Sequence, residues 1–117
     1  MKENVLKAKT YAFALKVIVV YKQIVAEHRE FVLSKQFLRA GTAPGALVRE
    51  AEFSQSRPDF ISKLSIALKE ANEVDYWISL LRDSDYISEL TAIRLLSEST
   101  EIISLLVSSI KTAKSHL

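Results

Sequence analysis

Residues 34–81 read SKQFLRAGTAPGALVREAEFSQSRPDFISKLSIALKEANEVDYWISLL. Within this stretch, the segment GTAPG (41–45) holds both glycines of the chain and one of its two prolines. Glycine and proline each weaken a helix, yet the apolar residues keep helical spacing on both sides of the segment. We therefore predict one kinked helix over about 32–53, with two helices split by a GTAPG loop as the alternative. Three small residues would let a neighbouring helix approach closely: Gly41, Ala43 and Gly45.

The start of the next helix has the clearest local signal in the chain. Ser56 and Asp59 have the spacing of a capping box, and Pro58 lies in the first turn, where its missing N–H is tolerated. An apolar stripe then continues to residue 81, and the acidic sequence RDSDY (82–86) predicts a turn after it. The stripe consists of Phe60, Leu64, Ala67, Ala71, Val74, Ile78 and Leu81.

Two further helices flank this pair. Apolar spacing predicts the first over about 5–27, followed by a polar connection at 28–31. The last begins after a cap at Ser88 and ends near Lys111 and Lys114, whose charges suit a helix C-terminus. Its predicted core stripe is Ile93, Leu96, Ile103, either Leu106 or Val107, and Ile110, with Ser97, Ser99, Ser108 and Ser109 on the surface.

These elements predict an all-α fold, an up-down-up-down antiparallel four-helix bundle. With 117 residues, of which 49% are hydrophobic and 26% charged, the chain suits a single domain over 1–117. The apolar arcs of the first, third and fourth helices are wider than one bundle core needs. We expect the surplus to be buried between subunits of a homo-oligomer.

The sequence contains no catalytic or cofactor motif. The absence of cysteine excludes disulfides, thiolate zinc sites and cysteine nucleophiles, and it is typical of a cytoplasmic protein. His28 and His116 lie at predicted helix ends without a second histidine at ligand spacing. The GTAPG segment lacks the Lys-Ser/Thr ending of a phosphate-binding loop. We expect no enzyme activity, cofactor or metal, and no membrane partner because the apolar N-terminal segment is too short to span a bilayer.

Charge is divided unevenly along the chain. Residues 1–58 hold ten Lys or Arg against five Asp or Glu, whereas residues 59–117 hold six against nine. This excess is smaller than that of a dedicated nucleic-acid binder, but an oligomer would multiply it. Two rows with seven-residue spacing on the first helix are the candidate contacts to RNA or DNA: Lys2, Lys9 and Lys16, then Lys22 and Arg29.

Polar residues in the middle of the two central helices form a second candidate cluster. An antiparallel hairpin that turns near residue 55 brings Arg39 level with Glu73. We predict a polar network that fixes the register of this hairpin, made of Gln36, Arg39, Glu50, Glu73 and Tyr76. The alternative is a metal or acid–base site, but it lacks the Glu-x-x-His pairs of di-iron bundles. Its carboxylates would be Glu50, Glu70 and Glu73.

The sequences LSKQFLRAGTAPGALVREA (33–51) and DFISKLSIALKEANEVDYW (59–77) resemble the bacterial four-helix bundle protein family, also called the 23S ribosomal RNA intervening-sequence protein family. The resemblance covers nearly the whole chain. Where the family pattern usually has Asn-Ile-Ala-Glu-Gly, this chain reads LVREA at 47–51. The residues that carry the resemblance are Gln36, Arg39, Ala40, Gly45, Glu50, Phe60, Leu64, Ala67, Glu73 and Tyr76.

The resemblance implies a bundle that assembles into a ring-like homopentamer with no established enzymatic activity. Similar proteins are accessory factors of diversity-generating retroelements, basic pentamers that engage nucleic acid and a reverse transcriptase, and they are more basic than this chain. We therefore expect a non-enzymatic homo-oligomer that presents a surface to RNA, DNA or a reverse-transcriptase-like protein. The alternative is a structural protein–protein interaction module without nucleic-acid affinity.

Overall fold

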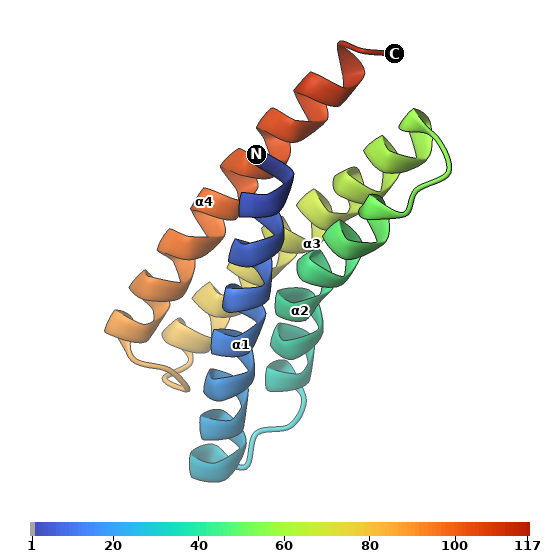
Figure 1. The fold of residues 1–117 in the computed structure, drawn as a ribbon. Helices are drawn as coiled ribbons and strands as arrows, with labels where there is room; N and C mark the ends of the chain where they lie inside the picture. The colour runs from blue at the N-terminus through green and yellow to red at the C-terminus, as the bar shows by residue number, and fades with distance from the viewer. Residues whose placement is uncertain (1) are drawn as a thin grey trace.

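In the computed structural model, the described part of the chain forms four α-helices joined by short connections (Figure 1). The backbone is described for residues 2–117 and the side chains for residues 4–117. The helices are α1 (Lys2–His28), α2 (Leu33–Glu52), α3 (Arg57–Asp83) and α4 (Glu89–Lys114). The predicted number and order of helices are confirmed, and the predicted ends differ from the observed ones by a few residues.

The helices pack as an antiparallel bundle in chain order. α1 contacts α2, α2 contacts α3, α3 contacts α4, and α4 closes the bundle against α1. The domain is elongated, with extents of 48 × 21 × 19 Å. The contact between α1 and α4 is the sparsest of the four, and Figure 1 shows these two helices diverging toward the C-terminal end of α1.

Serine side chains start the two later helices. Ser56 Oγ accepts a hydrogen bond from the Asp59 N–H at 3.2 Å, and the Asp59 carboxylate accepts one from the Gln55 N–H at 3.1 Å. Ser88 Oγ accepts from the Thr91 N–H at 3.1 Å. Each of the two serine bonds satisfies a backbone donor that the first turn of a helix leaves free. Both predicted caps are confirmed.

The connection between α1 and α2 has neither glycine nor proline, and a glutamate organises it instead. Glu30 accepts hydrogen bonds from the N–H groups of Val32, Leu33 and Ser34 at 2.7 to 2.9 Å. Burial raises the pKa of Glu30, but these N–H groups outweigh that effect, and the net shift is downward. Arg29, with φ of 52°, makes the left-handed step that ends α1.

α2 is continuous from Leu33 to Glu52 with Pro44 inside it, so the prediction of one helix rather than two is confirmed. The segment's glycines face α1. A Cβ added to Gly41 would lie 2.7 Å from both Cγ atoms of Val17, and one added to Gly45 would lie 3.4 Å from the Thr10 carbonyl oxygen. Close approach therefore occurs between α1 and α2. Ala43, the third predicted small residue, is half-buried.

The core lies along the bundle axis and includes the predicted stripe of α3, with Leu64 through Leu81 buried. The predicted stripe of α4 is only partly right. Its last two members, Leu106 and Ile110, are buried. Ile93 is 56% exposed, and the buried face also includes two residues assigned to the surface, Ser99 and Ser109. The buried residues of α4 mostly recur every three or four positions, the spacing of one face of a helix, and serines occupy two of these positions. They are Ala92, Leu95, Ser99, Ile102, Leu106, Ser109, Ile110 and Ala113.

Candidate interaction surfaces

A polar network joins α2 to α3 in the middle of the bundle. Arg39 Nη1 forms an ion pair with Glu70 Oε2 at 2.7 Å, and Nη2 pairs with Glu73. The same arginine donates through Nε to Gln36 Oε1 at 3.2 Å. Trp77 Nε1 donates to Glu73 Oε2 at 3.0 Å and holds that carboxylate in place. The arginine therefore bridges two turns of α3 from one position on α2.

The observed network differs in membership from the predicted one. The structure brings Gln36, Arg39 and Glu73 together. Glu50 is exposed and its carboxylate has no hydrogen bond or ion pair among the described residues. Tyr76 contributes only its ring, which packs edge-to-face on Trp77. Glu70 and Trp77 were missed as members, although residues three or four positions from Glu73 share its face of the helix.

A metal site among these carboxylates has no support in the geometry. Arg39 lies between Glu70 and Glu73 and pairs with both of them. Among the residues whose side chains are described, no group of three or more Asp, Glu or His is placed to hold a metal ion. The arrangement is one cation balanced by two carboxylates, which suits a structural contact.

A second polar contact joins α3 to α4. Ser99 Oγ donates a hydrogen bond to Asp75 Oδ1, and the serine is buried while the aspartate is half-buried. Burial raises the pKa of Asp75, and the hydrogen bond from Ser99 opposes that shift without cancelling it. The contact therefore holds a carboxylate that is harder to ionise than a solvated aspartate.

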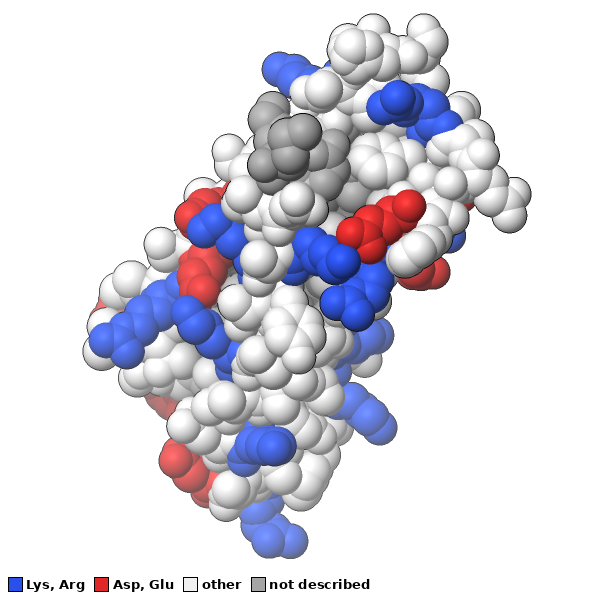
Figure 2. All heavy atoms as spheres, viewed as in Figure 1, with Lys and Arg blue, Asp and Glu red and all other residues white. Residues whose placement is uncertain are grey.

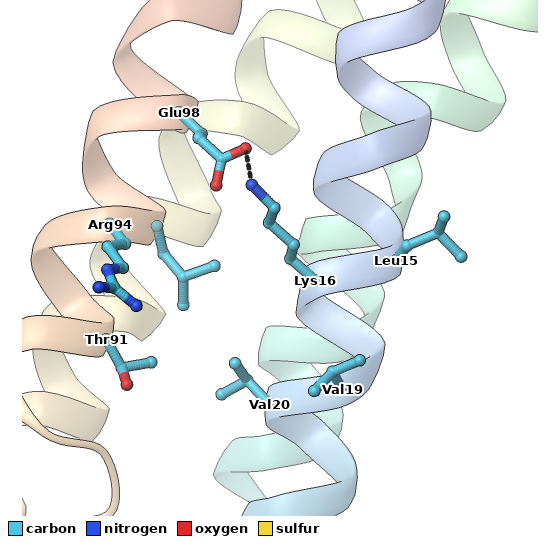
Figure 3. Close-up of a pocket in the computed structure, with 8 residues that line it drawn as sticks. Leu15, Lys16, Val19, Val20, Thr91, Arg94 and Glu98 are labelled. Carbon is cyan, nitrogen blue, oxygen red and sulfur yellow. Dashed lines mark hydrogen bonds and ion pairs between the residues drawn. The ribbon is translucent and has the colours of Figure 1, made fainter.

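A groove of about 380 Å³ lies between α1 and α4, where these helices diverge (Figure 3). An ion pair crosses one end of it, between Lys16 Nζ and Glu98 Oε1 at 2.7 Å, and the walls beyond are mainly aliphatic. We call this hollow the α1–α4 groove. Its lining consists of Leu15, Lys16, Val19, Val20, Thr91, Arg94, Leu95 and Glu98.

The rim of the α1–α4 groove is unusually apolar for a surface. Leu15 and Val19 on α1, which both line it, are 48% and 54% exposed. Aliphatic side chains gathered at one concave place indicate a surface that another apolar surface can cover.

The predicted basic rows do not form one surface. Lys9 pairs with Glu101 at 2.9 Å and Lys16 with Glu98, so the charges of both lysines are balanced by α4. Lys22 and Arg29 are exposed and have no ion-pair partner among the described residues. The side chain of Lys2, the remaining predicted contact, lies outside the described residues.

A different set of cations lies on the face made by α1 and α2. We call it the α1–α2 face and define it by Lys7, Tyr11, Lys22, Lys35 and Arg49. On α1, Tyr11 and Lys22 are eleven residues apart, which is close to three full helical turns, so both lie on one side of the helix. On α2, Lys35 and Arg49 are fourteen residues apart, close to four turns, and also share a side. Lys22, Lys35 and Arg49 are exposed and form no ion pair with described residues. Figure 2 shows basic side chains along α1 and α2 and acidic ones mainly at the α4 edge.

One acidic residue does reach this face. Glu52, at the end of α2, accepts both of its contacts from Lys7 Nζ, at 2.9 and 3.1 Å. The pair is exposed, so its contribution to stability is small, and it leaves the charge of Arg49 unbalanced.

Among the described residues, no helix is long and apolar enough to span a membrane.

Comparison with known proteins places these surfaces in context. A family model described as 23S rRNA-intervening sequence protein matches residues 2–108. The chain is also similar to a crystal structure of a protein with unknown function from the S23 ribosomal protein family of Bacteroides thetaiotaomicron VPI-5482. The two are 53% identical with a TM-score of 0.93, over 95% of this chain and 99% of that one. No curated protein matches the chain.

Proposed function

The chain belongs to the 23S rRNA-intervening sequence protein family, and we propose that it acts without catalysis, as a homo-oligomer that binds RNA or DNA. The observation that supports binding is the α1–α2 face. Its exposed cations Lys22, Lys35 and Arg49 have no carboxylate partner among the described residues, whereas Lys9 and Lys16 are paired with α4. Phosphates of a nucleic acid would supply the missing counter-charge.

The α1–α4 groove supports the proposal of assembly. Its half-exposed aliphatic residues Leu15 and Val19 would lose contact with water if a second copy covered them. The family resemblance suggests a ring of five copies. A ring repeats the α1–α2 face once per subunit, so weak contacts at each copy add along one nucleic-acid strand.

Charge reversal on the α1–α2 face tests the binding proposal. We expect Lys22→Glu, Lys35→Glu and Arg49→Glu together to weaken binding of a fluorescently labelled RNA strongly at low salt, measured by anisotropy. For the wild-type protein, the logarithm of affinity should fall linearly with the logarithm of salt concentration. Each phosphate contact adds roughly 0.7 to 0.9 to that slope, so removing three cations should flatten it by about 2.

The matched control reverses three exposed lysines outside the α1–α2 face: Lys69, Lys111 and Lys114. Both triple variants change the net charge equally, so only the position of the charge differs between them. We expect the control to keep most of the wild-type affinity. Equal loss in the two variants would mean that net charge alone attracts RNA, and the absence of wild-type binding to RNA or DNA at low salt would contradict the proposal.

A second candidate is a protein–protein interaction module without nucleic-acid affinity. The α1–α4 groove supports it, because aliphatic walls beside Arg94 suit an amphipathic helix of another protein. A reverse-transcriptase-like partner, which the resemblance suggests, could be held there or through nucleic acid on the α1–α2 face. Nuclease treatment distinguishes the two: a complex that survives it is held by the protein surfaces.

A further inference from the structure

A smaller groove opens on the α1–α2 face, between Tyr11 of α1 and Arg49 of α2. Its volume is about 180 Å³, and Lys7 and Thr42 also line it. The space exists because the remaining lining residues, Ala14, Gly45 and Ala46, carry almost no side chain. At Gly45 even a Cβ would come within 3.4 Å of α1. The groove is therefore bounded by the backbones of two closely packed helices, with an aromatic ring and cations around it.

Tyr11 is the unusual member of this lining. It is 59% exposed, and neither ring packing nor a hydrogen bond of its hydroxyl engages it among the described residues. By contrast, the exposed Tyr76 packs on Trp77, and Tyr86 packs on His28. An unengaged aromatic ring beside a groove offers a flat apolar surface to another planar group.

The cations beside Tyr11 determine what that planar group can be. Arg49 is exposed and forms no ion pair among the described residues. The charge of Lys7 is already balanced by Glu52 at 2.9 Å. The guanidinium of Arg49 is therefore the group that would bind an anionic ligand in the groove. A guanidinium prefers phosphate and carboxylate oxygens, which it can bind in a bidentate manner. A planar ring next to a phosphate is the chemistry of a nucleotide.

We propose that this groove is a stacking site for a single-stranded nucleic acid, with a base on the ring of Tyr11 and the adjacent phosphate on Arg49. The inference rests on the proposed function and adds the form of nucleic acid that the face selects. In a duplex, both faces of a base are covered by its neighbours, so only an unstacked base can reach Tyr11. Stacking of one base on an aromatic ring changes affinity by roughly 5- to 100-fold.

The test compares a labelled single-stranded RNA with a duplex of the same length, in anisotropy titrations at one salt concentration. The wild-type protein should bind the single strand at least 5-fold more tightly. Tyr11→Ala should weaken single-strand binding by roughly 5- to 100-fold and leave duplex binding unchanged, because duplex contacts depend on the cations. Tyr11→Phe keeps the ring and should retain the wild-type preference. Far-ultraviolet circular dichroism and the mass in solution establish that each variant is folded and assembled.

Three results would overturn the inference. If Tyr11→Ala binds the single strand as tightly as the wild-type protein does, with the same salt dependence, stacking is excluded and the proposed function stands. If no variant and no wild-type protein binds either nucleic acid, the proposed function fails and the inference fails with it. If Tyr11→Ala changes the number of subunits, this face is a contact between copies of the chain and not a nucleotide site.

Discussion

Gly41 shows how one residue sets the distance between two helices. It is buried in the middle of α2, and the space that its side chain would occupy is filled by both methyl groups of Val17 on α1. Glycine weakens a helix by about 1 kcal/mol relative to alanine. The close packing of α1 on α2 offsets that loss, so the residue serves packing and not a turn.

We predict that Gly41→Ala lowers the free energy of unfolding by about 1–2 kcal/mol. The added Cβ would lie 2.7 Å from two Val17 methyl carbons, and overpacking of this kind costs about 1–3 kcal/mol, partly offset by better helix propensity. Gly45→Ala is the matched control, because its Cβ would make only ordinary contacts, and it should be neutral or stabilising by up to about 1 kcal/mol. Urea unfolding measures both variants, and a Gly41→Ala protein as stable as Gly45→Ala would refute the prediction.

Contacts that neither the usual capping residues nor the apolar spacing describe were the hardest to anticipate. The caps at Ser56 and Ser88 were predictable, because capping involves residues within one turn of the chain. Glu30 was not recognised as the group that starts α2, because glutamate at that position is not a usual cap. The sequence likewise placed small residues at 41–45 but could not tell that they face α1, since the partner of a helix face is decided by tertiary packing.

At the scale of elements, α3 and α4 illustrate what periodicity can and cannot predict. The α3 stripe was predicted correctly because its core positions are all apolar. The α4 stripe was only partly right, because the core face includes Ser99 and Ser109 and leaves Ile93 exposed. A serine is tolerated inside the bundle where a partner accepts its hydrogen bond, as Asp75 does for Ser99.

The contact between α3 and α4 makes stability depend on pH. The raised pKa of Asp75 means that the folded protein holds this proton more tightly than the unfolded chain, whose aspartate ionises near 3.8. Stability from this group is therefore greatest below pH 3.8 and falls as pH rises through the folded-state pKa. Asp75→Asn removes the charge but can still accept from Ser99.

We predict that Asp75→Asn is more stable than the wild-type protein at neutral pH. The difference should shrink as pH falls toward 3.8 and vanish below it, because the wild-type carboxyl is then protonated in both states. Thermal unfolding of both proteins across this range measures the effect. A variant that is less stable at pH 7, or a difference that does not change with pH, would show that ionised Asp75 is not disfavoured in the bundle.

The α2–α3 hairpin was the best-predicted element pair at the site level. Counting residues from the turn placed Arg39 level with Glu73, and the structure pairs them. The predicted network also included Glu50 and Tyr76, and neither side chain joins its hydrogen bonds. Height along a bundle follows from helix rise, whereas the direction of a side chain depends on the angle at which two helices meet, which residue counting does not supply.

At the scale of the whole molecule, the two surfaces have different proposed roles, nucleic-acid binding for the α1–α2 face and assembly for the α1–α4 groove. The α1–α2 face carries the unpaired cations Lys22, Lys35 and Arg49, and the α1–α4 groove carries the uncovered aliphatic residues. Both surfaces include α1, which accounts for the wide apolar arc and the basic residues that the sequence shows in this helix. Assembly through the groove would leave the α1–α2 face open to a nucleic acid.

The molar mass of the wild-type protein in solution, measured by light scattering after size exclusion, tests this account most directly. We predict an assembly of about five 13.2 kDa chains, and a lower mass when Leu15→Asp and Val19→Asp place charges in the α1–α4 groove. Ile66→Asp, at an exposed position on α3, is the control that should leave the mass unchanged. A wild-type protein that elutes as a single 13.2 kDa chain would contradict the account.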